Sequence, residues 1–568
     1  MSIGADILAA ALKRHGVREI FGQSIPSKLF LRGRRQGLRQ LAYRTENAGA
    51  AMADAYARAS GRVGVVAAQN GPAATLLVPG LGEALKASVP VVAIVQDVAT
   101  GARDRNAFQE LDHLALFAPV SRWVRRCERA DRLEDYVDMA FAAAASGHPG
   151  PAVLLVPVDV LDEAVTAATT PRSASRGHYP LDRSAPEAAR LDEAADWLAS
   201  ARAPVVIAGG GIHRSQAYDA LAELQGLGLP VATTVMGKGA IDETNALSAG
   251  VVGYFMGPRS RSEGMRPLIR EADVVVLVGN RTNQNGTDSW QLYPRDARYI
   301  HIDVDGLEIG RNYEALRLVG DARLALEGLV ERLRPRLGGS EPSWQAAAEA
   351  LIDSGRQHWA GQMSRWVDAS ATPIRPERVM GELDAMLDGQ STVVADASYS
   401  SIWVANFLTA RSPGPGFLTP RGLAGLGWGL PFAIGAKAAN PAHVVHCVTG
   451  DGGFGHVWAE LETAIRLDLP VIVTVLNNQL LGYQKHSEQV LHGDYTDACD
   501  FAPVDHAAIA RACGGHGVRI TEPDQYAAEL AAAIARPSVT VLDVLVDPSA
   551  YPPVTAYSGS EALTEQFW

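Results

Sequence analysis

The feature that most constrains this chain is a Gly-rich acidic turn that is followed, after one helical stretch, by two consecutive asparagines. The turn is Gly450-Asp451-Gly452-Gly453 and the pair is Asn477-Asn478. A Val-rich run, Val444 to Val448, precedes the turn. Leu469-Pro470 then ends the helical pattern, and a second apolar run, Val471 to Leu476, leads to the asparagines. This order predicts a strand, a turn, a helix and a second strand.

In a parallel βαβ unit the two strands are neighbours. Their carboxyl ends therefore bring Asp451 and Asn478 together at the edge where open α/β sheets bind ligands. A carboxylate, an amide oxygen and a backbone carbonyl form an oxygen set that suits Mg²⁺ sharing phosphate oxygens. The glycines allow backbone N–H groups to approach a phosphate, and the helix that begins near Phe454 directs its positive end toward it. Gly-Asp-Gly alone is more often a tight turn, but this context favours a metal-bridged diphosphate site.

The GDG turn followed by the NN pair resembles the signature of thiamine diphosphate (ThDP) enzymes, and the chain is similar to their acetolactate synthase branch. The resemblance implies an α/β fold of three doubly wound parallel-sheet domains that bind ThDP and Mg²⁺. It also implies Asp451 and Asn478 as side-chain ligands of Mg²⁺, with the carbonyl of Leu480 as the third protein ligand.

Glu46 begins a helical stretch rich in alanine and glycine that runs to Arg58. Taken alone, a carboxylate at a helix amino terminus is stabilised by the helix dipole. ThDP enzymes place a glutamate here to hydrogen-bond N1′ of the aminopyrimidine, so the resemblance implies that catalytic role for Glu46. Desolvation in a dry pocket is expected to raise the pKa of such a carboxylate. Family members commonly have His before this Glu, whereas this chain has Thr45.

Three more residues are implied to face the substrate. Gln23 lies in a loop that in the family faces the reacting carbon and usually has the sequence Gly-x-Pro-Gly. Gln109 matches the acetolactate synthase branch closely and is a candidate active-site amide; a polar loop residue is the alternative. True acetolactate synthases carry an apolar pair and a Trp in the loop after the asparagines, and Tyr483, Gln484 and Ser487 lie near those places. The predicted acceptor pocket is therefore more polar than in the family. The product therefore need not be acetolactate.

The remaining implied cofactor-binding residues belong to the diphosphate side of the site. Leu426 falls at the position of the bulky apolar residue that props ThDP into its bent conformation, although core packing alone also explains a leucine there. The other members of this set are Tyr399, Ser400, Gly425, Gly450, Gly452, Gly453 and Gly482.

Alternating helix and strand patterns predict an N-terminal pyrimidine-binding domain (1–165), a central Rossmann-like domain (188–335) and a C-terminal diphosphate-binding domain (375–548). The segment between the first two is rich in Ser, Pro, Arg and Thr, which is typical of a linker. The tail, 549–568, is a candidate lid over the site entrance, and fraying of its last residues is the alternative.

The central domain contains Gly209-Gly210-Gly211, which is an incomplete dinucleotide fingerprint. The segments Met236 to Gly239, Gly279 to Arg281 and Asp303 to Asp305 fall where the family's middle domain can hold FAD or an ADP moiety. An Asp at a strand end could accept a ribose hydroxyl. Some family members keep this domain empty, so FAD and a retained scaffold without ligand both stay open.

Composition limits the class of protein. The chain of 568 residues, with 47% hydrophobic and 20% charged residues, is expected to form two to four domains. A net charge of −12 argues against a nucleic acid or an anionic membrane as partner. The four cysteines form no C-x-x-C pair, and neither a signal peptide nor a membrane-spanning apolar run is evident. These features predict a cytoplasmic protein with reduced thiols.

The resemblance implies a transferase or lyase that forms or cleaves C–C bonds of a 2-oxo acid such as pyruvate. Alternatives within ThDP chemistry are a 2-oxo acid decarboxylase and a 2-hydroxyacyl-CoA lyase, in which Lys238 and Asp305 could serve the ADP of a CoA ester. A non-catalytic scaffold is the alternative of another class, but it requires a missing glutamate or metal ligand. In the family, Glu46 of one subunit and Asp451 of another share a cofactor, so a homodimer is the smallest active unit expected and a homotetramer is common. The sequence leaves open the donor and acceptor substrates and a regulatory subunit.

Overall fold

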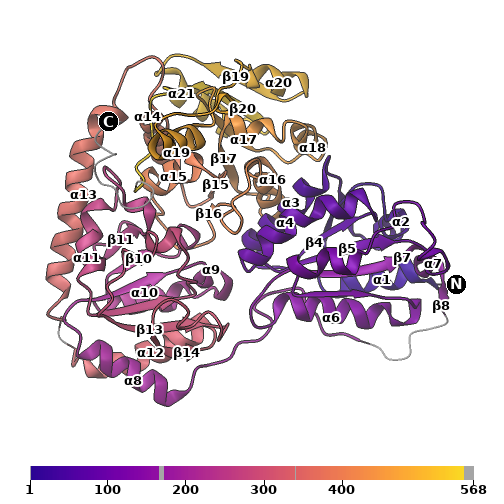
Figure 1. Ribbon diagram of the computed structural model, residues 1–568, viewed down its shortest axis with the longest axis horizontal. Coiled ribbons are helices and arrows are strands. Elements are labelled where there is room, and N and C mark those ends of the chain that lie inside the picture. Colours follow the sequence, from indigo (N-terminus) through magenta and orange to yellow (C-terminus); the bar gives the residue numbers. More distant parts are fainter. Residues whose placement is uncertain (1, 166–171, 340, 556–568) are drawn as a thin grey trace. The chain divides into compact units, whose positions relative to one another are not determined.

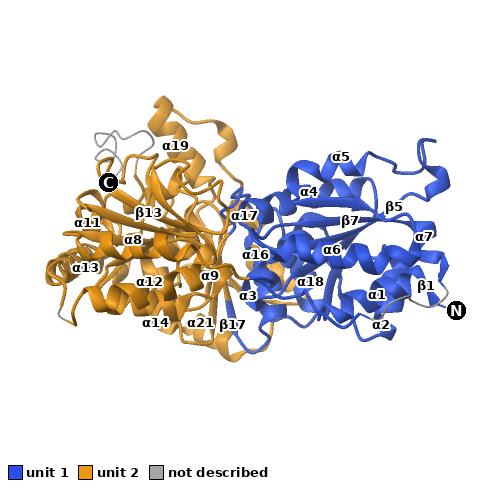
Figure 2. Cartoon of the chain, turned by 90° about the horizontal axis from the view of Figure 1, so that it is seen from below, with its two compact units in different colours: residues 1–182, 420–445, 456–471 blue, residues 183–419, 446–455, 472–568 orange. Residues whose placement is uncertain are grey.

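The computed structural model describes residues 2–165, 172–339 and 341–555 (Figure 1). Part of the expected linker, 166–171, and most of the expected lid, 556–568, lie outside the described residues. Contacts group the chain into two compact units (Figure 2). The first contains 1–182, 420–445 and 456–471, and the second contains 183–419, 446–455 and 472–568.

The first unit is built on a six-stranded parallel sheet with the order β3-β2-β4-β5-β7-β6. Its central strands are continuous apolar runs that are buried on both faces, as expected for a parallel sheet between helices. The strands are β2 (Glu19–Gly22), β3 (Arg39–Leu41), β4 (Gly64–Ala68), β5 (Val91–Asp97), β6 (Trp123–Arg126) and β7 (Ala152–Pro157). A separate antiparallel pair joins β1 (Ser2–Ile3) to β8 (Ala164–Val165).

Helix α3 (Glu46–Ser60) is the buried helix of this unit, and it packs against α4 (Pro72–Lys86) and α16 (Gly429–Ala439). Small residues make this packing close. A Cβ on Gly80 would lie 2.5 Å from the Cβ of Ala50, and one on Gly435 would lie 2.2 Å from the carbonyl oxygen of Met52. The alanine and glycine content of α3 therefore reflects close contact with two neighbouring helices. The other helices of this unit are α1 (Gly4–Arg14), α2 (Ser27–Arg35), α5 (His113–Phe117), α6 (Leu133–Ala145), α7 (Val158–Asp162) and α18 (Glu460–Arg466).

The second unit contains two further six-stranded sheets. The central one has the order β11-β10-β9-β12-β13-β14 and is parallel throughout. Its strands are β9 (Pro204–Ala208), β10 (Val231–Thr233), β11 (Ser248–Val251), β12 (Val274–Val278), β13 (Arg298–Asp303) and β14 (Ala315–Val319). Its helices are α8 (Ala188–Ala199), α9 (Gly211–Ser215), α10 (Tyr218–Gly226), α11 (Arg266–Arg270), α12 (Ala322–Arg336) and α13 (Gln345–Val367).

The C-terminal sheet has the order β16-β15-β17-β18-β20-β19. Its strands are β15 (Ser391–Ala395), β16 (Phe417–Leu418), β17 (Val444–Gly450), β18 (Ile472–Asn477), β19 (His516–Ile520) and β20 (Thr540–Leu545). Its helices are α14 (Pro376–Met386), α15 (Tyr399–Phe407), α17 (Asp451–Gly455), α19 (Gly482–His492), α20 (His506–Ala512) and α21 (Gln525–Ala535). The three parallel sheets confirm the predicted fold class.

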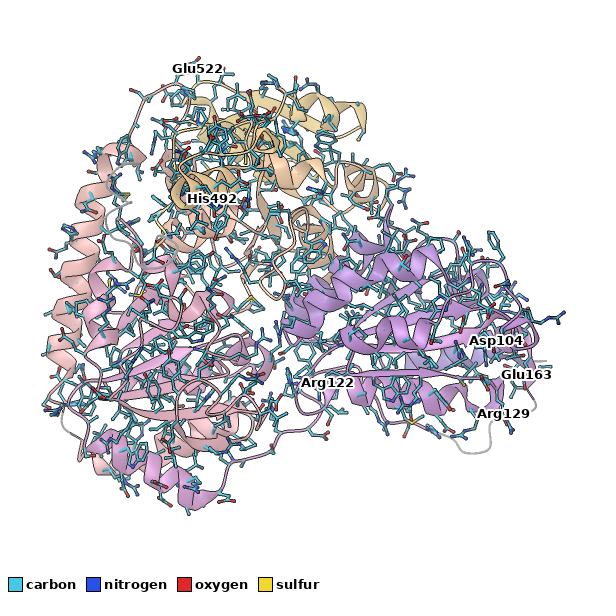
Figure 3. All side chains as sticks on the ribbon, viewed as in Figure 1. Asp104, Arg122, Arg129, Glu163, His492 and Glu522 are labelled. Carbon is cyan, nitrogen blue, oxygen red and sulfur yellow. The ribbon has the colours of Figure 1, made fainter. Side chains whose placement is uncertain are left out.

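The described side chains are drawn in Figure 3, where the labelled charged residues include Asp104 and Arg129 in the N-terminal part and Glu522 in the C-terminal part. Among the described residues, none of the helices has the length and apolar character needed to cross a membrane. The cysteines in the described part of the chain are all free, and three of the four are buried.

Candidate active site

The acidic turn and the asparagine pair lie at neighbouring strand ends. Strands β17 and β18 pair in parallel with Gly450 opposite Leu476, so Asp451 and the asparagines leave the sheet at the same edge. Helix α17 begins at Asp451, earlier than the start near Phe454 that the sequence predicts, so the acidic glycine turn is part of this helix. The backbone N–H of Gln479 donates to the Asp451 carboxylate, so Asp451 contacts the residue that follows the asparagine pair.

Asp451 is a buried carboxylate with one oxygen that has no hydrogen-bond partner. The residue is 6% exposed, and its Oδ1 atom is buried without a hydrogen-bond partner. Burial raises the pKa of Asp451 to about 7, even though the backbone N–H groups of Gly452 and Gln479 act in the opposite direction. A bound cation would remove this penalty, because an opposite charge favours the ionised form.

The neighbouring donors are neutral oxygens. The Oδ1 atom of Asn478 accepts a hydrogen bond from the N–H of Leu480 at 3.2 Å and retains a second lone pair. Within residues 2–165, 172–339 and 341–555, no group of three His, Cys, Asp or Glu side chains could hold a metal. A cation at this turn would therefore rest on one carboxylate with amide and carbonyl oxygens. That set fits Mg²⁺ with retained water or phosphate ligands better than it fits zinc or copper.

Two buried aspartates that the sequence motifs did not identify shape this edge of the sheet. A Cβ on Gly453 would lie 2.2 Å from Oδ2 of Asp396, so only glycine fits the turn beside that carboxylate. Asp543, on β20, accepts a hydrogen bond from the Asn477 side chain at 2.8 Å. Because the Asn477 side chain is bound to Asp543 within the fold, Asn478 is the asparagine that remains available as a ligand near Asp451. Only the strand pairing could have identified Asp543.

An aromatic cluster lies next to the asparagine pair. The hydroxyl of Tyr399 is 2.8 Å from Nδ1 of His486, and the His486 ring stacks on Tyr551 with centroids 4.2 Å apart. Tyr483 meets Tyr399 edge to face at 5.5 Å. A Cβ on Gly482 would lie 3.2 Å from both the Asn478 amide and the Tyr399 ring, so the cluster extends directly from the metal-binding candidates.

These aromatic groups are neutral. Burial lowers the pKa of His486 to about 4 and raises that of Tyr399 well above its ordinary value. Ser400, the next residue of α15, is also buried. In the described part of the tail, Tyr551 contacts His486, and further on the backbone N–H of Thr555 donates to the carbonyl of Tyr254 in the central domain at 2.9 Å.

Glu46 lies in the first unit, at the amino end of α3. It is 9% exposed, and burial raises the pKa of its carboxyl group. Thr45 is the N-cap of the helix, and its side chain accepts a hydrogen bond from the N–H of Ala48. The amide of Gln23 donates to the carbonyl of Arg44 at 2.6 Å. Gln23 and Glu46 therefore belong to one local structure.

Gln109 has a left-handed backbone conformation with φ of 60° and lies against the Asn70-Gly71 turn. Its Oε1 accepts a hydrogen bond from Gln69 at 2.8 Å, and Asn70 donates to its backbone carbonyl. The N–H of Gly71 donates to His113, so the loop and the turn are held together.

The Gly425-Leu426 segment also belongs to the first unit. A Cβ on Gly425 would collide with the Trp428 ring at 2.7 Å, and the Leu426 side chain is 39% exposed. Just before it, the N–H groups of Gly422 and Leu423 donate to the buried carboxylate of Glu83 at 2.7 and 2.6 Å. Glu83 also pairs with Arg58 at 3.2 Å. No local sequence pattern indicates this anchor, because it joins residues that are far apart in the chain.

The central domain departs from one expectation. Lys238 is 3% exposed, and its Nζ atom donates to both carboxylate oxygens of Glu243 at 2.8 Å. Lys238 is therefore a buried structural ion-pair partner and is not available to bind the ADP of a CoA ester. Gly209 and Gly211 pack on Gly279, where added Cβ atoms would lie 2.2 and 2.5 Å from its backbone atoms.

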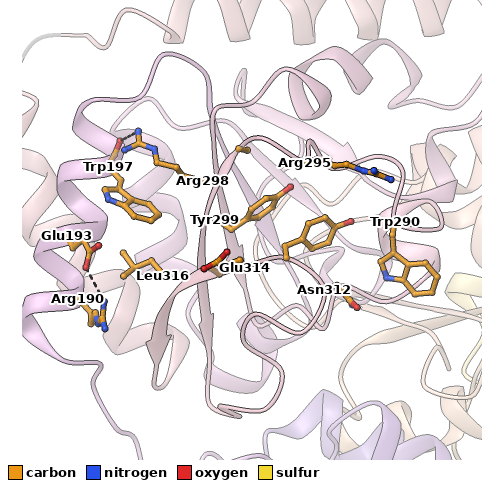
Figure 4. A pocket seen from close by; sticks show the side chains of 13 residues that line it. Arg190, Glu193, Trp197, Trp290, Arg295, Arg298, Tyr299, Asn312, Glu314 and Leu316 are labelled. Carbon is orange, nitrogen blue, oxygen red and sulfur yellow. Dashed lines mark hydrogen bonds and ion pairs between the residues drawn. The ribbon is translucent and has the colours of Figure 1, made fainter.

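A surface groove of about 720 Å³ lies elsewhere on the central domain, where Trp290, Arg295 and Tyr299 are among its lining residues (Figure 4). It includes the first residues of β13 and β14, Arg298 and Ala315. Ligands of open α/β sheets bind at the opposite, carboxyl ends of the strands. The groove is therefore separate from the candidate site.

Three parallel-sheet domains, with an acidic glycine turn beside an asparagine pair, define the ThDP-dependent class of enzymes. Family models of thiamine pyrophosphate enzymes match each of the three domains. The thiamine pyrophosphate enzyme N-terminal TPP binding domain matches residues 3–116, the central domain matches 191–329, and the C-terminal TPP binding domain matches 396–544.

Within this class of enzymes, the chain is similar to acetolactate synthase large subunits. The chain is 33% identical to the acetolactate synthase large subunit of Parasynechococcus marenigrum, over 96% of this chain and 87% of the relative. It is 31% identical to a probable acetolactate synthase large subunit of Methanococcus aeolicus, over 96% and 92%. It is 30% identical to the acetolactate synthase isozyme 3 large subunit of Escherichia coli, over 97% and 96%. The chain belongs to the thiamine pyrophosphate enzyme family, as an acetolactate synthase-like, ThDP-dependent carboligase or lyase.

Proposed function

We propose that this enzyme uses ThDP and Mg²⁺ to join a 2-oxo acid, with pyruvate as the first candidate, to a second carbonyl compound. The observation that carries the proposal is the buried, unpartnered Oδ1 of Asp451 beside the Asn478 strand end. The names of the acetolactate synthase relatives support a carboligase of this type.

In this proposal Asp451, Asn478 and the carbonyl of Leu480 hold Mg²⁺. Bound ThDP supplies a carbon nucleophile that attacks a substrate carbonyl. The glycines of the turn and the start of α17 present backbone N–H groups that would hold the diphosphate of the bound cofactor. The residues proposed to surround the cofactor are Tyr399, Ser400, Gly425, Leu426, Gly450, Gly452, Gly453 and Gly482.

Glu46 is the proposed acid–base residue. Burial raises the pKa of its carboxyl group, which favours a role in holding or moving a proton at the pyrimidine ring. Gln109 and Gln23 are proposed to orient the substrate through their amide groups. Each already makes one hydrogen bond to a neighbouring loop, and this fixes its position.

Tyr483 is the proposed contact of the acceptor substrate. It lies in a cluster with Tyr399 and His486, where hydroxyl and imidazole groups stand in place of an apolar pocket. This polar lining suits a polar acceptor substrate, or a reaction in which a proton takes the place of the acceptor. A 2-oxo acid decarboxylase is therefore the second candidate. Lys238 is already bound in its ion pair with Glu243, and this argues against an acyl-CoA substrate.

We further propose the domain boundaries 1–165, 188–335 and 375–548, a homodimer or homotetramer with shared sites, and a cytoplasmic location that keeps the free cysteines reduced. FAD in the central domain stays an open alternative, and a yellow colour of the purified protein would reveal it.

The proposal is tested by incubating protein loaded with ThDP and Mg²⁺ with a panel of 2-oxo acids and acyl-CoA esters, followed by mass spectrometry. A hydroxy-oxo acid formed from pyruvate with release of CO₂ supports the carboligase. An aldehyde as sole product favours the decarboxylase. Turnover of acyl-CoA esters alone would overturn the proposed substrate class.

A further inference from the structure

A second buried glutamate holds the loop that presents Glu46. Glu460 is the first residue of α18 and is only 1% exposed. Its Oε1 accepts a hydrogen bond from the backbone N–H of Thr45 at 3.0 Å, and the N–H of Arg44 lies 3.2 Å from both of its oxygens. The hydroxyl of Thr463 donates to Oε2 at 2.7 Å. The carboxylate is thus surrounded by donors.

The rest of α18 strengthens the same attachment. Arg466 donates to the carbonyl of Ala42 at 2.6 Å, and Arg39 donates to the carbonyl of Leu467 at 2.9 Å. Glu462 pairs with the Arg44 side chain at 2.8 Å, but this pair is largely exposed. Glu460 is the one buried carboxylate of these contacts, and it binds the backbone immediately before Glu46.

These hydrogen bonds affect the position of the Glu46 side chain. Thr45 is the N-cap of α3, so its backbone position sets where the helix starts and where the Glu46 side chain points. Water competes little for a buried acceptor, so these hydrogen bonds hold the backbone in place. We propose that Glu460 is a positioning residue that fixes the Arg44-Thr45 backbone and thereby aims Glu46 at the cofactor. This role rests on the proposed function of Glu46.

Amide hydrogen–deuterium exchange of the cofactor-free protein tests the attachment itself. In Glu460→Ala, amides of 42–47 should exchange at least tenfold faster than in the wild type. Glu460→Gln, which keeps one acceptor oxygen, should lie between the two. Glu223→Gln is the control: it removes an exposed ion pair with Arg334 on the central domain, and it should change exchange of 42–47 by less than about twofold. Unchanged exchange in both Glu460 variants would overturn the proposal.

A double-mutant cycle tests whether Glu460 acts through Glu46. The readouts are the affinity for ThDP and Mg²⁺ by calorimetry and the rate of C2–H exchange of the bound cofactor by NMR. Glu460→Gln should leave the affinity within threefold and slow C2 exchange at least tenfold. In a Glu46→Gln background the same change should have no further effect on C2 exchange. Fully additive losses would show that Glu460 acts independently of Glu46 and would refute the inference.

Failure of the proposed function gives a different result. If the wild type neither binds ThDP nor exchanges its C2 proton, the cofactor assignment is wrong, although the amide-exchange result still reports on the attachment. If C2 exchange is normal but pyruvate is not consumed, only the substrate proposal fails. Should Glu460→Ala not fold, Glu460→Gln carries both tests.

Discussion

Removing the charge of Asp451 should make the metal-free protein more stable at neutral and alkaline pH, although the residue is the central metal-binding candidate. Burial displaces the pKa of this carboxyl group from its ordinary value of 3.8 to about 7. Between these two pH values the folded protein keeps a proton that the unfolded chain releases. Stability therefore falls as pH rises through this window, and the full penalty persists above pH 7.

This displacement of the Asp451 pKa corresponds to a loss of folding free energy of roughly 4 kcal/mol at most. We expect Asp451→Asn, which has nearly the same shape and no charge, to recover about 2 to 4 kcal/mol at pH 8 and almost nothing at pH 4. A gain of 1 kcal/mol raises the melting temperature of a domain of this size by about 2 to 4 °C.

The assay is differential scanning calorimetry of metal-free wild type and Asp451→Asn from pH 4 to pH 8. The transition that contains the site is identified as the one that ThDP and Mg²⁺ shift upward in the wild type, because ligands that bind only the folded state stabilise it. The variant should lose that upward shift. Wild type and variant of equal stability at pH 8, or a difference that does not depend on pH, would refute the reasoning.

Three further predictions concern separate parts of the chain. Glu46→Gln should bind ThDP and Mg²⁺ with affinity near that of the wild type but lose about 10²- to 10⁴-fold in turnover, measured by calorimetry and steady-state kinetics; unchanged turnover removes Glu46 from the mechanism. Gly453→Ala should weaken ThDP binding at least tenfold, because its Cβ would lie 2.2 Å from the Asp396 carboxylate; calorimetric affinity within twofold of the wild type contradicts this. Lys238→Met should destabilise the protein by about 3 to 5 kcal/mol by leaving Glu243 buried and unpaired, whereas combining it with Glu243→Gln should recover part of the loss; thermal unfolding measures both, and an Arg323→Ala surface variant is the control.

The local pattern of the sequence predicted the fold class well, because a parallel sheet between helices leaves a strong signal in single segments. The runs Val444 to Val448 and Val471 to Leu476 predict two strands, and these are β17, Val444–Gly450, and β18, Ile472–Asn477. The helical stretch expected from Glu46 to Arg58 is α3, Glu46–Ser60. The strand, turn and helix around Asp451 follow from adjacent residues alone, since glycine content and apolar runs act over short distances.

The sequence alone also identified the chemical types of the candidate site, because the GDG and NN motifs each lie within a few residues. Only the tertiary structure decided which buried polar groups have partners. It showed that Lys238 is bound to Glu243, that Asn477 is bound to Asp543, and that Oδ1 of Asp451 has no partner. Glu460 reaches the Glu46 loop across more than four hundred residues of sequence. Such contacts depend on how helices and strands pack, and no local periodicity records them.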